Sequence, residues 1–291
     1  MLRIVLPKGS LERATLQLFA EADLGVERGS DVSYSASIED PRVAEVRILR
    51  PQEIPVYVAD GLFDLGITGR DWIEETSSDV VSLGELRYSK QTANPIRVVL
   101  AVADGSPVRE VSDLPAGSRV ATEYPSLTQR YLESHGVQAS IRLSYGATEA
   151  KVPDIADAVV EITETGRALV AAGLRVVDTI LVSSTELVAN PLAASDPVKR
   201  HAMEQLATLL QGTLEARGKV LVKLNVSEAD LKRVLEVLPS LKAPTVSKLS
   251  GTDGFAVEAV VAKVGINVLI PELKDRGASD IIELPLAKIV H

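Results

Sequence analysis

The chain has 291 residues, 46% of them hydrophobic and 24% charged, with a net charge of −9 at pH 7. That length predicts two or three domains. The acidic balance argues against nucleic acid as a partner, because no excess of Lys and Arg can neutralise its phosphates. The absence of cysteine excludes disulfides, thiolate metal sites and cysteine nucleophiles.

The first apolar run breaks at Pro7 and Lys8, which is too early for a secretion signal. No later apolar segment approaches the length of a membrane span. We therefore expect a cytoplasmic protein with no membrane partner.

Short β-rich segments alternate with helical ones through the first two-thirds of the chain. Ser10 is expected to cap the first helix, and a proline to begin the second. This alternation predicts α/β layers with mainly parallel sheets, whose ligands bind beyond the carboxyl ends of the strands. The predicted strands are 2–6, 43–49, 62–68, 97–103, 119–122, 140–143 and 156–162, and the predicted helices are 10–22, 51–60 and 126–135.

The last part of the chain has a different pattern. A helix at 198–216 leads to two β-α-β units, with Ser227 expected to cap the first of their helices. The resulting order, β-α-β-β-α-β, is that of a ferredoxin-like domain. Its predicted strands are 219–225, 245–249, 256–264 and 280–285, and its helices are 227–237 and 266–276.

The stretch VVEITETGRAL carries the clearest sign of a ligand site. An apolar strand runs into Thr163, Thr165 and Gly166 and then opens a helix, whose N–H groups suit a phosphate. Glu161 and Glu164 do not suit a bare anion, but carboxylates accept hydrogen bonds from sugar hydroxyls. A phosphosugar explains both features, and the alternative is an ordinary capped turn.

Other candidates also follow predicted strands. Residues 8–10 open a helix and offer N–H groups and an ammonium to a polyphosphate, unless they form a plain turn. In residues 66–71, the backbone, Thr68 and the Arg70 guanidinium could contact an anion. The alternative is a surface ion pair between Arg70 and Asp71. Tyr124 either stacks on a base or covers a core. Glu149 and Lys151 flank a turn, where an ordinary solvated pair is the default.

Five segments resemble the ATP phosphoribosyltransferase family, which opens histidine biosynthesis. The C-terminal β-α-β-β-α-β pattern resembles the regulatory domain of the family's long form, so the resemblance spans essentially the whole chain. The sequence departs from many members at Ala168, where a Thr often stands, and at 85–95, which lacks a Gly-Arg-rich run. In chain order, the segments are LPKGSL at 6–11, DLGITGRDW at 64–72, VATEYPSLTQRYL at 120–132, SYGATEAKVPDIADAVVEITETGRAL at 144–169 and DTILVSSTELVANP at 178–191.

The resemblance implies a two-lobed α/β body of the type II periplasmic-binding-protein-like kind, followed by the ferredoxin-like regulatory domain. Lobe I would comprise 1–95 and 185–212, lobe II 96–184, and the regulatory domain 213–291. The implied assembly is a homohexamer that can exchange with dimers.

The implied reaction joins N1 of the adenine of ATP to C1 of phosphoribosyl diphosphate and releases diphosphate. Mg²⁺ would act through the substrate phosphates, since the sequence shows no metal-binding motif of its own. Histidine, the end product of the pathway, would inhibit the enzyme at an allosteric site in the C-terminal domain. The alternative is that this domain only joins subunits.

The resemblance also assigns residues. Glu161 and Lys8 are the implied catalytic residues. The phosphoribosyl-diphosphate site comprises Asp157, Glu161, Thr163, Glu164, Thr165, Gly166, Arg167 and Ala168. The ATP site comprises Lys8, Gly9, Ser10, Gly69, Arg70, Asp71 and Tyr124. The histidine site is expected around Asn225, Leu241, Lys242, Ala243 and Thr245.

Two other functions are open at this point. A non-catalytic two-lobed solute-binding protein would share the body, but the expected lack of a secretion signal and the carboxylate-rich loop argue against it. A different phosphoribosyltransferase would share the loop, but it would leave the C-terminal domain unexplained.

Overall fold

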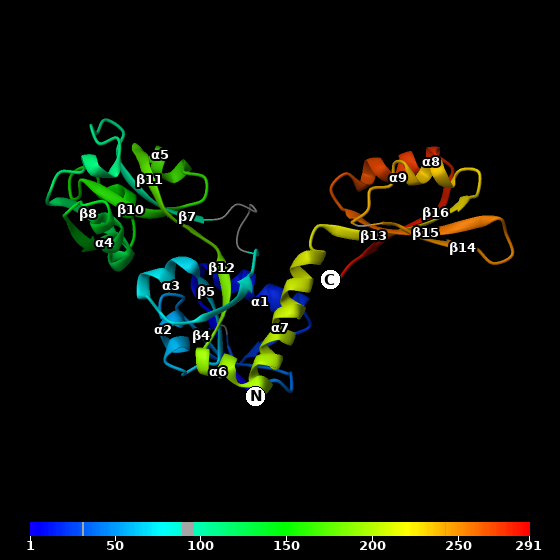
Figure 1. Cartoon of the computed structure of the whole chain (residues 1–291), viewed down its shortest axis with the longest axis horizontal. Helices are drawn as coiled ribbons and strands as arrows, with labels where there is room; N and C mark the ends of the chain where they lie inside the picture. Colours follow the sequence, from blue (N-terminus) through cyan, green and yellow to red (C-terminus); the bar gives the residue numbers. More distant parts are fainter. Residues whose placement is uncertain (31, 89–95, 242) are drawn as a thin grey trace. The chain divides into compact units, whose positions relative to one another are not determined.

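The computed structural model describes residues 1–30, 32–88, 96–241 and 243–291 (Figure 1). These residues form two compact units, 1–207 and 208–291, which divide the chain within one long helix. The first unit contains a seven-stranded and a five-stranded sheet, and the second contains a four-stranded sheet. The expected α/β class, with a two-lobed body and a C-terminal β-α-β-β-α-β domain, is confirmed. The exact lobe boundaries stay a prediction.

The seven-stranded sheet has the order β2-β3-β4-β1-β5-β12-β6. Its centre is parallel, because β1 pairs in parallel with both β4 and β5, whereas the strands toward both edges pair antiparallel. The prediction of mainly parallel sheets is therefore wrong. The strands are β1 (Leu2–Pro7), β2 (Val26–Arg28), β3 (Ser35–Ile38), β4 (Val43–Leu49), β5 (Leu65–Gly69), β6 (Val81–Glu85) and β12 (Thr185–Ala189).

The first two helices, α1 and α2, begin later than the sequence predicts. A 3-10 turn, Gly9–Leu11, precedes α1, so Ser10 does not cap that helix, and α2 begins at Ile54 with Pro55 in its first turn. Among the described residues, no helix is both long and apolar enough to span a membrane. The helices are α1 (Glu12–Glu21), α2 (Ile54–Ala59), α3 (Arg70–Thr76), α6 (Pro191–Ser195) and α7 (Pro197–Ala216).

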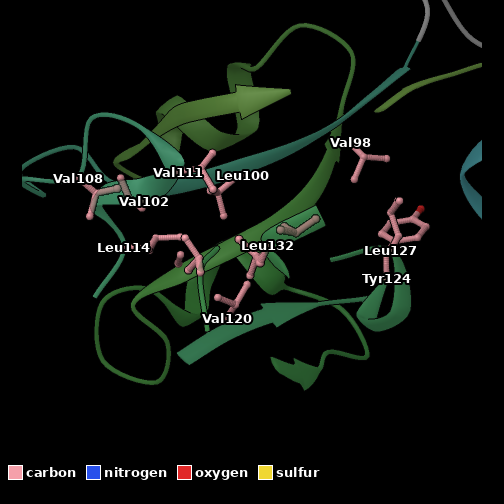
Figure 2. Packing of buried hydrophobic residues seen from close by; sticks show 13 residues of the cluster. Val98, Leu100, Val102, Val108, Val111, Leu114, Val120, Tyr124, Leu127 and Leu132 are labelled. Atoms are coloured by element: carbon pink, nitrogen blue, oxygen red, sulfur yellow. The ribbon is translucent and has the colours of Figure 1, made fainter. Parts of the chain in front are cut away.

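The five-stranded sheet has the order β11-β7-β10-β8-β9, and its central strands are buried on both faces. Along β7, Val98, Leu100 and Val102 belong to one core, shown in Figure 2, whereas Val99 and Ala101 belong to the core on the other face. This explains why the strand is continuously apolar. The elements are β7 (Ile96–Ala103), β8 (Ser118–Thr122), β9 (Ala139–Leu143), β10 (Ala158–Thr163), β11 (Leu174–Ser183), α4 (Pro125–Ser134), α5 (Arg167–Ala171) and the 3-10 helices Val111–Asp113 and Thr148–Lys151.

In the second unit, α8 and α9 cover one face of the sheet β14-β15-β13-β16 (Figure 1). The first helix is shorter than predicted, because Ser227 still belongs to β13 and its Oγ accepts the N–H of Asp230 at 3.2 Å. The elements are β13 (Lys219–Ser227), α8 (Leu231–Leu235), β14 (Thr245–Lys248), β15 (Gly254–Ala262), α9 (Ile266–Asp275) and β16 (Ala278–Pro285).

A buried hydrogen-bond network connects elements of the two larger sheets. Asp71, in the first turn of α3, accepts a hydrogen bond from Ser183 Oγ at 2.6 Å and another from the Tyr124 hydroxyl at 2.8 Å. Ser183 ends β11 and Tyr124 precedes α4. The Tyr124 ring also packs on Trp72, with ring centres 4.6 Å apart. One carboxylate thus links α3, α4 and β11.

A second carboxylate from α3 caps α4. Glu75 accepts hydrogen bonds from the N–H groups of Ser126 at 3.0 Å and Leu127 at 2.8 Å. The residue at the N-cap position, Tyr124, makes no side-chain cap. A negative charge at a helix N-terminus satisfies N–H groups that lack partners in the helix and complements the helix dipole. Packing of α3 against α4 therefore provides the cap that the local sequence lacks.

We predict that Tyr124→Phe lowers the free energy of unfolding by about 1–3 kcal/mol, because it removes a donor from a buried carboxylate. Chemical denaturation measures this loss. Tyr131→Phe is the matched control, since the Tyr131 hydroxyl bonds the exposed Asp178, and we expect it to change stability by no more than about 0.5 kcal/mol. Equal effects of the two substitutions would contradict the structural role of the buried network.

Candidate active site

The loop between β10 and α5 lies where the sequence predicts a phosphate site. Thr163 ends β10 with a buried side chain, and its Oγ1 accepts a hydrogen bond from the N–H of Gly166 at 2.8 Å. Gly166 has φ +76°, and no atom lies within 4 Å of the place that a Cβ would occupy. Because residues with a Cβ rarely adopt this left-handed conformation, the turn favours glycine.

The rest of the loop is more open. The side chains of Thr165, Arg167 and Ala168 are exposed, and Glu164 is half-buried. The helix α5 has only five residues, and Thr163 already uses the N–H of Gly166. The expectation of a new helix with free N–H groups is therefore corrected in part. Thr165 and Arg167, on either side of Gly166, carry an exposed hydroxyl and an exposed guanidinium.

Glu161 lies on the same face of β10 as Thr163, since alternate residues of a strand share a face. Its Oε1 accepts the N–H of Ile162 at 2.9 Å. Burial raises the pKa of the Glu161 carboxyl, hydrogen bonds from Ile162 and Thr148 oppose the rise, and the nearby charge of Glu123 adds to it. Glu161 is thus a half-buried acceptor beside the loop.

Asp157 does not join this group. It precedes β10, at the opposite end of the strand from the loop, and six residues at about 3.3 Å each place it about 20 Å from Thr163. Its carboxylate bonds Arg119, at 2.7 Å to the guanidinium and 2.8 Å to the backbone N–H. These bonds hold the pKa of Asp157 below its usual value. The prediction that Asp157 binds the donor is therefore corrected, and it stabilises the start of the strand.

Residues 8–10 lie at the carboxyl end of β1, as predicted. The ammonium of Lys8 lies 4.0 Å from the centre of the Tyr34 ring, a cation–π contact. The N–H of Gly9 donates to the Glu12 carboxylate at 3.2 Å, and Ser10 is exposed. Because β1 and β5 are parallel neighbours, this segment and Gly69 at the end of β5 lie at the same edge of the sheet.

Two residues predicted to bind ATP are core residues instead. The Tyr124 side chain is only 2% exposed, and Asp71 is 9% exposed. Burial raises the pKa of the Tyr124 phenol far above its usual range, and the Asp71 charge adds to the rise. Neither side chain is available to a nucleotide, so the stacking prediction for Tyr124 and the binding prediction for Asp71 are corrected. Gly69 serves the same network, since a Cβ there would stand 2.1 Å from Asp71 Oδ1.

Arg70 follows Gly69 and is half-buried. Its guanidinium bonds Glu74, one turn later in α3, and lies 3.7 Å from the buried carboxylate of Glu186 on β12. The alternative of a simple Arg70–Asp71 pair is wrong, because Asp71 has other partners. The Arg70 guanidinium is thus held by two carboxylates of the same lobe.

The part of the chain that the structure describes contains no group of three or more His, Asp or Glu side chains close enough to hold a metal ion. The carboxylates near Glu161 therefore do not form a protein-held metal site of the usual kind. A metal that acts here would have to bring oxygen ligands with it, as a substrate diphosphate can.

The residues predicted to bind histidine lie in the second unit. Asn225 pairs with Ala256 and Thr245 with Glu258, on the face of the sheet that α8 and α9 do not cover. The Asn225 amide donates to Asp280 at 2.9 Å. Leu241 and Ala243 are exposed just before β14, and Lys242 lies outside the described residues, as do positions 89–95 of the departing segment 85–95.

The structure gives Lys151 a partner that the sequence does not predict. A solvated pair with Glu149 is the default expectation for this lysine. The Lys151 ammonium instead bonds Ser144 Oγ, which lies 2.7 Å from Thr148 Oγ1. The residues fall within the segment 144–169, but hydroxyl and lysine spacing alone does not distinguish such contacts from a solvated turn.

Comparisons with known proteins agree over the full chain. Residues 50–212 match the family model described as ATP phosphoribosyltransferase, and residues 216–288 match that of the HisG C-terminal domain. A protein of Pelotomaculum thermopropionicum named ATP phosphoribosyltransferase is 49% identical over 289 residues, 99% of each chain. One of Solibacter usitatus with the same name is 46% identical over 290 residues, 100% of this chain and 99% of its own.

A solved structure is similar as well. It is a chain of the ATP phosphoribosyl transferase (HisG:HisZ) complex of Thermotoga maritima, with a TM-score of 0.63 and 30% sequence identity. The match covers 74% of the present chain and 99% of that chain.

Proposed function

This chain belongs to the ATP phosphoribosyltransferase family, and we propose that the Glu161 carboxylate and the loop 163–168 form its phosphoribosyl-binding site. The enzyme is a pentosyltransferase that catalyses the first step of histidine biosynthesis, joining N1 of the adenine of ATP to C1 of phosphoribosyl diphosphate with release of diphosphate. This membership argues against both alternatives, a solute-binding protein and another phosphoribosyltransferase. One observation supports this site most directly. The half-buried Glu161 carboxylate lies on the same face of β10 as Thr163, whose hydroxyl holds the glycine turn that follows.

The reaction depends mainly on how the two substrates are aligned. Diphosphate is a good leaving group, and adenine N1 carries no proton, so no general base is required. The protein has to hold two anionic substrates with N1 facing C1 and to exclude water, which would hydrolyse the donor. Glu161 would accept hydrogen bonds from the ribose hydroxyls, and Thr165 and Arg167 would hold the 5-phosphate, with Glu164 beside them.

We place the proposed ATP-binding site at one edge of the seven-stranded sheet. At the end of β1, Lys8 offers an ammonium and Ser10 a hydroxyl at the same sheet edge as Arg70. The N–H of Gly9, which donates to Glu12, would exchange that partner for the ligand. Lys8 would neutralise developing charge on the departing diphosphate, which is the catalytic role proposed for it. Tyr124 and Asp71 are left out of this site because both are buried in the core.

Mg²⁺ is proposed to enter with the substrates. The described residues offer no three-carboxylate cluster, but Mg²⁺ commonly binds through substrate phosphates with one or two carboxylates and keeps several waters. When bound, the ion would stabilise the negative charge of diphosphate.

We further propose a cytoplasmic homohexamer that exchanges with dimers and is inhibited by histidine. ATP and phosphoribosyl diphosphate are cytoplasmic metabolites, which supports the location. The uncovered face of the C-terminal sheet supports an interface or a ligand site. On it, Asn225 and Thr245 offer an amide and a hydroxyl, and Glu258 and Asp280 offer acceptors for an amino group.

The first prediction concerns the glycine turn. Gly166→Ala should weaken binding of phosphoribosyl diphosphate, because a Cβ disfavours the left-handed turn by about 1–2 kcal/mol and occupies the open space beside it. Calorimetry measures the loss. Gly173→Ala is the matched control, with φ +72° and equally open surroundings at the other end of α5. If both variants bind the donor alike, the loop does not hold its phosphate.

The second prediction concerns Glu161. Wild-type enzyme should release diphosphate from ATP, phosphoribosyl diphosphate and Mg²⁺, and Glu161→Gln should lose about 1–3 kcal/mol of transition-state stabilisation. The active form is the carboxylate, so wild-type activity should fall as pH drops through its raised pKa. The variant should lack this acid limb. If Glu161→Gln has the same kinetics as the wild type, Glu161 has no role in binding or catalysis.

The third prediction concerns the C-terminal domain. Millimolar histidine should lower turnover without competing with ATP, because inhibition is a coupling between distant sites. Deleting 219–291 should abolish this sensitivity while some activity survives. In the full chain, Asn225→Ala should weaken inhibition about tenfold.

Asn267→Ala is the control for that substitution, since it makes the same change on α9, which covers the other face of the sheet. A full-length enzyme that ignores histidine, or equal responses of the two Asn variants, would leave the domain without the proposed sensing site.

A further inference from the structure

Two side chains meet at the carboxyl end of β4. Lys8 follows β1 and Tyr34 precedes β3, and these two strands lie on either side of β4 in the sheet. The N–H of Lys8 donates to the Leu49 carbonyl at 2.7 Å. The Tyr34 carbonyl accepts the N–H of the residue before it, Ile48, at 2.9 Å. Both residues are thus fixed to consecutive positions of β4, and the Lys8 ammonium lies 4.0 Å from the centre of the Tyr34 ring.

The Tyr34 ring is not placed by packing in a hydrophobic core. Tyr34 is 56% exposed, and its hydroxyl makes no hydrogen bond to any residue that the structure describes. Its backbone is held by a local turn, in which Ser33 Oγ donates to the Ser35 carbonyl at 2.8 Å and accepts the Ser35 N–H at 3.2 Å. Burial therefore does not explain the position of the ring, whereas its contact with the Lys8 ammonium does.

Lys8 has no carboxylate partner in the described part of the chain. Glu12, the acidic residue nearest to it in the sequence, bonds the Arg28 guanidinium at 2.7 Å instead. No other carboxylate oxygen among the described residues lies within 4 Å of the Lys8 ammonium. The aromatic ring is thus the group that holds this cation.

An aromatic ring holds a cation differently from a carboxylate. The negative face of its π-system attracts the ammonium, but the ring has no net charge, so the positive field of Lys8 stays available to a phosphate. Arg70 at the same sheet edge differs, because Glu74 and Glu186 offset its charge. The ring also restricts the flexible four-carbon stem of Lys8, which lowers the entropy that is lost when the ammonium binds a substrate.

We propose that Tyr34 is a positioning residue that holds the Lys8 ammonium in place for the polyphosphate of the substrates. The proposal rests on the proposed function of Lys8 at the departing diphosphate. It adds to that site a residue that lies outside all five segments that resemble the family.

The first test separates the aromatic face of Tyr34 from the volume of its side chain. Tyr34→Leu removes the ring, whereas Tyr34→Phe keeps it. Tyr34→Leu should lower kcat about three- to tenfold, the range for loss of a cation–π contact, with a smaller change in KM, because Lys8 acts on charge that develops in the transition state. Tyr34→Phe should keep most of the activity. Tyr57→Leu is the matched control, since the Tyr57 hydroxyl bonds Glu53 beside α2, and it should leave kcat unchanged.

A double-mutant cycle tests whether Tyr34 acts through Lys8. In a Lys8→Met background, which keeps an unbranched stem and removes the charge, Tyr34→Leu should lower kcat no further. An equal loss in both backgrounds would overturn the positioning role and assign Tyr34 to direct contact with the substrate. A loss of the same size in Tyr34→Phe and Tyr34→Leu would overturn it as well, because the ring would then have no effect.

A measurement without substrate separates this proposal from the proposed function. In proton NMR of the full chain, the ε-methylene signals of Lys8, identified by their loss in Lys8→Met, should lie upfield of the other lysine signals because of the ring. Tyr34→Phe should keep this shift, and Tyr34→Leu should remove it. Unshifted signals in the wild type overturn the proposal, whatever the activity. Shifted signals together with a fully active Lys8→Met enzyme would uphold the contact but overturn the function of Lys8.

Discussion

The buried carboxylate of Asp71 is the interaction on which the arrangement of the catalytic body depends. A carboxylate removed from water is costly unless hydrogen bonds replace its hydration. Here Ser183 and Tyr124 provide those bonds, and they come from β11 and from the residue before α4. The absence of a side chain at Gly69 leaves room for the carboxylate. The position of α3 is thereby tied to two elements of the other sheet.

The proposed phosphoribosyl-diphosphate site combines, on one strand and the turn that follows it, groups that suit a phosphate and a carboxylate that suits sugar hydroxyls. Phosphate favours hydroxyls, N–H groups and a guanidinium, and ribose hydroxyls favour a charged acceptor. Alternation along β10 puts Glu161 and Thr163 on one face, while the turn at Gly166 begins three residues after Thr163. In the proposed site, a single strand-to-helix connection therefore offers groups for both the phosphate and the ribose hydroxyls of a phosphosugar.

In the C-terminal domain, alternation along the strands also gives the two faces of the sheet different side chains. Its helices cover one sheet face, where Val220, Val222, Leu224 and Val226 of β13 meet Val257 and Ala259 of β15. The alternate residues of the same strands form the uncovered face, which carries polar and charged groups such as Asn225 and Glu258. One face builds the core, and α8 and α9 leave the other face uncovered.

The sequence by itself determined many of the local elements, the β-α-β-β-α-β order and the strand-to-turn design of the Glu161 segment, because periodicity and turn chemistry act within a few residues. It did not predict the strands β2, β3, β6, β11 and β12. Tertiary structure alone decided that Tyr124 is a core donor, that Asp157 pairs with Arg119 and that Lys151 bonds Ser144. It also decided that β12 joins the first sheet antiparallel to β5. The partners of Asp71 lie 53 and 112 residues away in the chain. No local pattern encodes such contacts, because a polar side chain acquires its role from the groups that folding brings to it.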